Sequence, residues 1–326
     1  MKIENKTIDQ NSPIFFIAEA GVNHNGSIDK AIELVDIAIR SGADAVKFQT
    51  FKAADLNLPN APKSDYHIET TGNDKKQSWY DLLKTQELTF DMHKTLINYC
   101  KKNKIIFMST PYDIKSIDLL MELGVDAFKV ASTDTNNLPF LKYLVGKKKP
   151  IILSTAMSSL EDIKESINVF KNEKFNNFAL LQCTGNYPSK ISDSNLRVMY
   201  TYRDEFNCIY GYSDHTLDII NPIAATAMGA KIFEKHFTIN KNLPGPDHRM
   251  SLNEDELTTT IKLIRETELS LGSNEKKVLE SEKDNQKKLR KSIVSVSSIK
   301  KGQKISKELI SIKRPGLGIP PKYYNK

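Results

Sequence analysis

Eight short apolar runs alternate with segments of helical periodicity, and this alternation constrains the fold of the chain more than any other feature. The runs are Ile14–Ala18, Ala45–Gln49, Ile105–Ser109, Ala127–Ala131, Ile151–Thr155, Phe178–Cys183, Cys208–Tyr212 and Lys231–His236. The intervening segments repeat apolar residues every three or four positions, as at Ile117, Leu120 and Leu123. Such alternation is typical of βα units whose strands form a parallel sheet. Eight consecutive units predict an α/β chain folded as a (β/α)8 barrel, the TIM barrel.

A doubly wound open sheet is the rival architecture for alternating strands and helices. Its dinucleotide-binding fingerprint, Gly-x-Gly-x-x-Gly, does not follow the first apolar run. The length of 326 residues fits one barrel of about 250 residues with a small appendage. We therefore predict a catalytic barrel over residues 1–271. Its one long irregular insertion, Phe51–Glu87, is expected to act as a lid or specificity loop.

The pattern changes after residue 271. Residues 272–288 are charged and almost free of large apolar side chains, which predicts a linker. Residues 289–326 hold a strand-like run at Ser292–Val296 and an irregular stretch at Arg314–Pro321. A piece of this size cannot build much of a core alone. We therefore expect a small and incomplete C-terminal domain that leans on another surface.

Composition narrows the functional class. The N-terminal residues contain no apolar core of a signal peptide, and no apolar run approaches the roughly 20 residues of a membrane helix. Three scattered cysteines are too few for a disulfide framework. The net charge of +7 comes from basic residues interleaved with acids, which favours attraction of small anionic substrates over a nucleic-acid surface. We expect a cytoplasmic protein that binds neither nucleic acid nor membrane.

Polar side chains stand where the predicted strands end, and active sites of (β/α)8 barrels lie at that end. They are Glu19, Lys47, Gln49, Thr110, Lys129, Ser132, Ser154, Thr184, Ser213, His215, Glu234 and His236. Residues two apart in one strand point to the same side, so several of these face the barrel mouth together. Any one of them alone fits equally well as a buried group with satisfied hydrogen bonds. As a set, they predict an active site.

Two lysines inside one barrel predict a bound anion. Burying Lys47 and Lys129 without negative charge would be costly, so we expect an anion between them. Hydroxyl groups of Thr110, Ser132, Ser154 and Ser213 complete a seat for a phosphate and a carboxylate. A lysine inside a barrel is also the usual nucleophile of Schiff-base aldolases, so that reaction remains an alternative.

Two of the six histidines, His215 and His236, end neighbouring strands and are able to share one metal ion. No local HExxH motif supports this interpretation, and two hydrogen-bonded histidines are the alternative. Spacing alone does not choose between manganese, magnesium and zinc.

Six motifs together resemble the sialic acid synthase family. They are Glu19–Gly26 (EAGVNHNG), Val46–Phe51 (VKFQTF), Ser109–Pro111 (STP), Tyr212–His215 (YSDH), Glu234–Thr238 (EKHFT) and Gly245–His248 (GPDH). In that family a barrel precedes a small antifreeze-like (SAF) domain, and Arg290–Val294 and Lys313–Gly318 resemble pieces of it. The resemblance implies condensation of phosphoenolpyruvate with an N-acylated mannosamine-type sugar aldehyde, giving N-acetylneuraminate or legionaminate and phosphate.

The resemblance also implies residue roles. Catalytic residues are Glu19, His215 and His236, of which the two histidines hold Mn²⁺ or Mg²⁺. Phosphoenolpyruvate is held by Lys47, Gln49, Thr110, Lys129, Ser132, Ser154 and Ser213. The sugar is held by Asn73, Asp134, Tyr187, Asp247 and Arg314. The family further implies a domain-swapped homodimer, in which Arg314 reaches the partner's site. A non-catalytic binding protein with a truncated lid is the remaining alternative.

Overall fold

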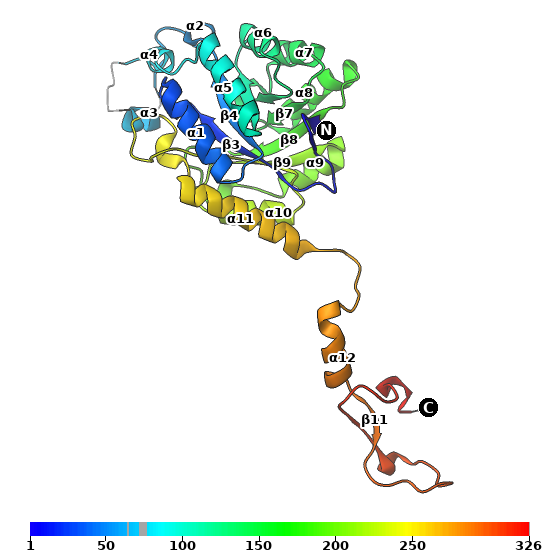
Figure 1. Cartoon of the computed structure of the whole chain (residues 1–326). Helices are drawn as coiled ribbons and strands as arrows, with labels where there is room; N and C mark the ends of the chain where they lie inside the picture. Colours follow the sequence, from blue (N-terminus) through cyan, green and yellow to red (C-terminus); the bar gives the residue numbers. More distant parts are fainter. Residues whose placement is uncertain (64, 72–76, 326) are drawn as a thin grey trace. The chain divides into compact units, whose positions relative to one another are not determined.

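The computed structural model describes residues 1–63, 65–71 and 77–325. The chain divides into two compact units, Met1–Leu271 and Gly272–Lys326 (Figure 1). Asn73, one of the predicted sugar-binding residues, lies outside the described residues. No helix in the described part of the chain is long and apolar enough to cross a bilayer.

The first unit contains the predicted barrel, so the prediction of eight parallel strands is confirmed. The strands are β3 (Phe15–Gly21), β4 (Ala45–Thr50), β5 (Ile106–Pro111), β6 (Phe128–Val130), β7 (Ile151–Ser154), β8 (Phe178–Cys183), β9 (Ile209–Asp214) and β10 (Ile232–His236). Their order is β5-β4-β3-β10-β9-β8-β7-β6. Because β5 and β6 also lie in contact, the sheet is nearly closed. Closure sets the last strand beside the first, with His236 opposite Glu19.

Helices cover the outside of the barrel (Figure 1). They are α1 (Ile28–Arg40), α5 (Phe90–Asn103), α6 (Ile114–Glu122), α7 (Leu138–Gly146), α8 (Leu160–Asn172), α9 (Val198–Phe206), α10 (Ile220–Ala227) and α11 (Glu254–Leu271). In α1, the Ser27 side chain caps the first turn by accepting a bond from the Lys30 amide. The same helix buries Ala31, Leu34 and Val35 on one face.

Alternation along the strands gives the barrel two chemically different halves. Inward residues near the amino ends are apolar, such as Phe15, Ala45 and Ile232, and they pack into one buried cluster. Inward residues near the carboxyl ends are polar or charged, such as Lys47 and Glu234. The apolar half fixes the barrel, and it leaves the polar half at the end where barrel enzymes place their active sites.

Two further features of the first unit lay outside the sequence prediction. A hairpin of β1 (Lys2–Ile3) and β2 (Lys6–Thr7) precedes the barrel, and Ile3 and Ile8 join the apolar cluster of its interior. The insertion after β4 is partly helical, with α2 (Ala53–Leu56), α3 (Asp65–Thr70) and α4 (Trp79–Lys84).

The second unit is small. Strands β11 (Ser292–Ser295) and β12 (Ile310–Lys313) pair antiparallel, and Ile293 also bridges to Ile319. The short helix α12 (Lys283–Leu289) lies mostly within the range predicted as a linker. It is joined to the rest of the unit, since the Gly316 amide donates to the Lys287 carbonyl. The assignment of this unit as a SAF domain stays a prediction.

Candidate active site

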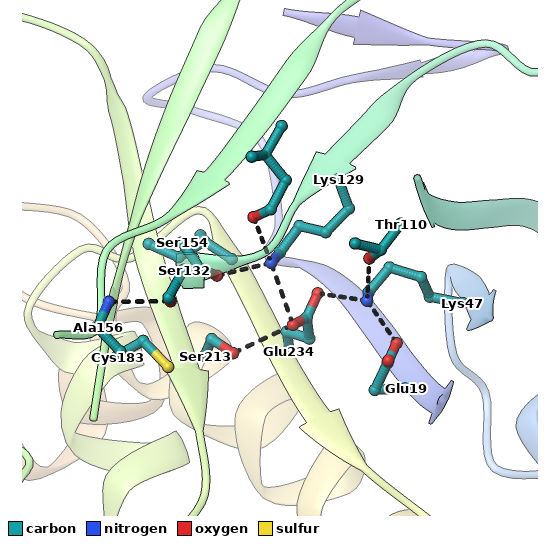
Figure 2. A network of polar contacts seen from close by, with 12 residues as sticks. Glu19, Lys47, Thr110, Lys129, Ser132, Ser154, Ala156, Cys183, Ser213 and Glu234 are labelled. Carbon is teal, nitrogen blue, oxygen red and sulfur yellow. Dashed lines mark hydrogen bonds and ion pairs between the residues drawn. The ribbon is translucent and has the colours of Figure 1, made fainter. Parts of the chain in front are cut away.

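Lys47 lies on one side of a buried polar network at the carboxyl ends of the strands (Figure 2). Its Nζ is 2.6 Å from Glu19 Oε2 on β3 and donates to Thr110 Oγ1 on β5 over 2.8 Å. Burial alone would lower the pKa of Lys47, but the carboxylates of Glu19 and Glu234 raise it above its ordinary value. Lys47 therefore stays charged inside the barrel.

Lys129 occupies the opposite side of the same network (Figure 2). Its Nζ donates to Ser154 Oγ on β7 over 2.6 Å and to its neighbour's carbonyl at Val130 over 3.2 Å. Burial, aided by repulsion from Lys47, lowers the pKa of Lys129 despite the attraction of Glu234. The two ammonium groups thus have different environments within one layer.

The negative charge expected between the two lysines is supplied here by the side chain of Glu234. Its carboxylate oxygens lie 3.7 Å from Lys47 Nζ and 3.5 Å from Lys129 Nζ, and Ser213 Oγ donates to Oε1 over 3.1 Å. Burial favours the neutral carboxyl, but Lys129 and Lys47 hold the pKa of Glu234 below its ordinary value. The sequence marks Glu234 as a strand-end residue, yet its position between the lysines follows only from barrel closure.

Glu19 titrates close to neutrality. Burial and the nearby Glu234 raise its pKa to about 7, against the opposing effect of Lys47. Because the folded-state pKa lies above the unfolded value, this carboxyl stabilises the fold below its unfolded pKa of 4.5 and loses that contribution as the pH rises through about 7.

We therefore expect the unfolding free energy of the wild type, relative to Glu19→Gln, to fall between about pH 5 and pH 8. Urea denaturation of both proteins across this range measures the difference. A Glu254→Gln control removes a partly exposed carboxyl whose pKa is lowered by Arg40, so its difference should not fall over this range. A flat Glu19 difference would contradict the assigned titration.

His215 and His236 face each other at the ends of β9 and β10, with ring centroids 5.5 Å apart. His215 Nδ1 is 2.8 Å from the Thr184 carbonyl, which leaves Nε2 for another partner. The ring of Tyr187 covers His215, with centroids 4.2 Å apart. Burial and the nearby His215 lower the pKa of His236 well below its ordinary value, so this imidazole is neutral.

The side chains around the two histidines fit a metal ion only if water or substrate supplies its remaining ligands. Within the described residues, no three His, Cys, Asp or Glu side chains are grouped closely enough to hold a metal by themselves. His236 Nδ1 is nevertheless buried without a hydrogen-bond partner among those residues, and Asp247 Oδ2 is 3.9 Å away. Histidine binds metal ions in its neutral form, so His236 is suited to be a ligand. The remaining positions would fall to water and substrate oxygen.

Asp247, Glu19 and Gln49 converge above the backbone of Gly21. Their nearest polar atoms lie 3.4, 3.4 and 3.5 Å from the position that a Cβ at Gly21 would take. Gly21 has φ +54°, a conformation that glycine adopts without strain. The predicted phosphoenolpyruvate residue Gln49 and the predicted sugar residue Asp247 therefore share one neighbourhood with Glu19.

Three other predicted residues make hydrogen bonds that involve neither of the two lysines. Ser132 lies beyond β6, where its Oγ accepts a bond from the Ala156 amide over 2.9 Å. Asp134 is buried and accepts a bond from Asn137 over 2.9 Å. Arg314 lies in the second unit, where its Nε donates to the Leu289 carbonyl over 2.9 Å.

The structure adds two residues that the sequence prediction omitted. Cys183, on β8, is buried with Sγ 3.7 Å from His215 Nδ1. Tyr112 follows Thr110 by two positions, and burial beside the carboxylates of Glu19 and Asp247 raises its pKa above the ordinary value. The period of two along β5 was the signal that could have included Tyr112.

Comparison with known proteins decides the family. Residues 34–276 match the NeuB family. The chain belongs to this family. It is 45% identical to the N,N'-diacetyllegionaminic acid synthase of Campylobacter jejuni, over 94% of this chain and 92% of that protein. It is 44% identical to the synthase of the same name from Legionella pneumophila, over 94% of this chain and 87% of that protein.

A solved structure supports the assignment of this chain to the NeuB family. The N-acetylneuraminic acid synthetase of Leptospira borgpetersenii superposes with a TM-score of 0.76 at 31% identity. The match covers 87% of this chain and 94% of that structure. The family resemblance inferred from the six motifs is thus confirmed.

Proposed function

We propose that the chain is a nonulosonic acid synthase, a transferase that joins phosphoenolpyruvate to an N-acylated amino-sugar aldehyde with release of phosphate. The observation that carries this proposal is the buried layer of Lys47, Lys129, Glu19 and Glu234 beside the facing His215 and His236. The two lysines of this layer can donate charge-assisted hydrogen bonds to a multiply charged anion, and the imidazoles beside them can hold a metal. The names of the relatives favour a 2,4-diacetamido sugar as the acceptor, ahead of N-acetylmannosamine.

Phosphoenolpyruvate would lie over the two lysines. Lys47 and Lys129 supply charge-assisted hydrogen bonds to its phosphate and carboxylate. The hydroxyls that now bond these lysines, Thr110 and Ser154, lie within reach of the same anion, and Ser213 and Ser132 extend the set. The network is preorganised because most of these side chains are already buried and hydrogen-bonded.

The bond changes balance with water as the third reactant. The methylene carbon of phosphoenolpyruvate bonds to the aldehyde carbon, whose oxygen takes a proton, and positive charge develops at the adjacent enol carbon. Water adds there and loses one proton. The remaining hydroxyl proton leaves with the phosphate as the ketone forms and the C–O bond to phosphate breaks. Glu19, with a pKa of about 7, is suited both to accept the proton from water and to stabilise the positive carbon.

His215 and His236 would hold Mn²⁺ or Mg²⁺, which, when bound, polarises and orients the sugar aldehyde. Asp247 faces His236 and approaches Glu19, so it stands where sugar hydroxyls would meet the anion seat. Tyr187 packs on His215 and would close this side of the sugar position. Asp134 and Asn73 are assigned to the sugar by family resemblance.

Phosphate release tests the proposed function. Purified protein with phosphoenolpyruvate and Mn²⁺ should release phosphate only when N-acetylmannosamine or a 2,4-diacetamido relative is added, and mass spectrometry should find the nine-carbon acid. No release with any acceptor would refute the synthase. Borohydride treatment in the presence of pyruvate separates the alternative: an adduct at Lys129 or Lys47 would indicate a Schiff-base aldolase. Calorimetric binding of phosphoenolpyruvate without turnover would indicate a binding protein.

We propose that the chain forms a homodimer in which the second unit of one chain covers the active site of the partner chain. Residues 272–326 carry 15 Lys and Arg against five Asp and Glu, whereas residues 1–271 carry 32 against 35. Exposed apolar side chains on the same unit include Ile305, Leu317 and Ile319. A basic unit with uncovered apolar surface fits a position over another chain's anionic substrates. Arg314 would bond sugar oxygens there.

Mixing two inactive variants tests this assembly. His236→Ala lacks a metal ligand, and Arg314→Ala lacks the proposed cross-chain contact. If Arg314 acts across the interface, mixed dimers contain one intact composite site, and up to about half of wild-type activity per dimer should return. Native mass spectrometry of isotope-labelled chains confirms subunit exchange. Exchanged mixtures that stay inactive would exclude the cross-chain role.

A further inference from the structure

Asp214 and Lys235 form the most buried ion pair described in the barrel, on the side of the strands that faces away from the active site. Lys235 Nζ lies 2.5 Å from Asp214 Oδ2, and the two side chains are 1% and 0% exposed. They come from adjacent strands and are the last register partners of the β9–β10 ladder. Each precedes one of the facing histidines, because His215 and His236 are the next residues in sequence.

The ammonium group of Lys235 contacts the residues on both sides of His215 in the sequence. Besides Asp214, Lys235 Nζ donates to the carbonyl of Thr216 over 2.7 Å. Asp214 Oδ1 accepts bonds from the Thr216 amide over 2.9 Å and from its hydroxyl over 2.8 Å. The residues on both sides of His215 are therefore tied to the residue directly before His236. Where the backbone ladder ends, these side-chain contacts continue the connection between the two strands.

We propose that the Asp214–Lys235 pair is a positioning element that sets the separation and orientation of the His215 and His236 rings for a shared divalent ion. This rests on the proposed function, which gives those rings the metal. A buried ion pair is weak evidence for stability, since a neutral pair of similar volume often replaces it at little cost. A role in holding the two imidazole rings in place explains its position better, because small displacements of metal ligands lower the affinity for the metal.

The test replaces the pair by neutral side chains of similar size, Asp214→Asn with Lys235→Met. Metal-free protein is titrated with MnCl₂, and the electron paramagnetic resonance signal of free Mn²⁺ gives the Mn²⁺ dissociation constant. We expect a roughly 10- to 100-fold weaker Mn²⁺ affinity, with cooperative thermal unfolding retained. The control neutralises a more exposed pair that includes the residue just before β4, Asp44→Asn with Arg265→Met, and should leave the Mn²⁺ affinity unchanged. A folded Asp214/Lys235 variant with an affinity within twofold of wild type overturns the proposal.

Thr216→Val covers the case in which the double variant does not fold. It removes one hydroxyl bond to Asp214 while keeping the side-chain shape. A severalfold loss of Mn²⁺ affinity supports the positioning role, and an unchanged affinity overturns it.

A second readout separates this inference from the proposed function. Imidazole ¹⁵N resonances of metal-free protein report ring environment without any turnover. Shifts of His215 and His236 in the Asp214/Lys235 variant, but not of the distant His93, support positioning even if the wild type makes no nonulosonic acid. Unshifted resonances overturn it whatever the activity of the wild type.

Discussion

Replacing His236 with alanine should abolish turnover while the barrel stays folded. The variant removes a buried imidazole whose Nδ1 has no hydrogen-bond partner among the described residues, so we expect folding to lose little. It removes one of two proposed metal ligands, and Lewis-acid assistance is worth several kcal/mol in the transition state. At 1.36 kcal/mol per factor of ten, kcat/KM should fall by at least about a thousandfold. Phosphate-release kinetics at saturating Mn²⁺, with circular dichroism for folding, measure both effects.

His215→Ala should behave similarly, since the two rings face each other at 5.5 Å. Phosphoenolpyruvate binding should survive in both variants, because Lys47 and Lys129 remain, and calorimetry should find it within severalfold of wild type. The control is His93→Gln, which alters a buried histidine bonded to Thr50 on the outer side of β4. It should affect stability without changing the Mn²⁺ dependence. Near-normal turnover of His236→Ala would dismiss the metal role.

Glu234→Gln should weaken the ligand-free fold, and inorganic phosphate should restore it. The variant leaves Lys129 without its carboxylate neighbour, because it removes the negative charge that lies between the two buried ammonium groups. Breaking a buried ion pair by removing one partner costs about 3–5 kcal/mol. A bound anion would then supply the missing negative charge. Phosphate should therefore raise the melting temperature of the variant more than that of the wild type, where Glu234 competes for the same lysines.

Differential scanning calorimetry with and without phosphate measures both shifts. Glu254→Gln is the matched control, because Glu254 pairs with Arg40 at the surface and such pairs contribute about 1 kcal/mol or less. Equal phosphate shifts in Glu234→Gln and the wild type would show that the lysines do not form the anion seat. Sodium chloride at matched ionic strength separates specific binding from screening.

The sequence by itself determined the barrel fold and identified most residues of the candidate site. Periods of two and of three to four are local properties, so all eight strands and their helices could be predicted from short windows. Strand-end position then selected Lys47, Lys129, His215 and His236, because parallel strands place their carboxyl ends at one edge. The hairpin β1–β2 was missed because strands of two residues carry no readable period.

Only the tertiary structure decided which of these side chains touch. Sequence indicates that Glu234 and Lys129 both point inward, but nothing local indicates that Glu234 lies between Lys129 and Lys47. That position arises because β10 pairs with β3, which brings the two ends of the barrel sequence together. The same closure sets Asp247 near Glu19. Side-chain direction follows from local backbone geometry, whereas partners and pKa shifts depend on closure and burial, which involve residues far apart in the sequence.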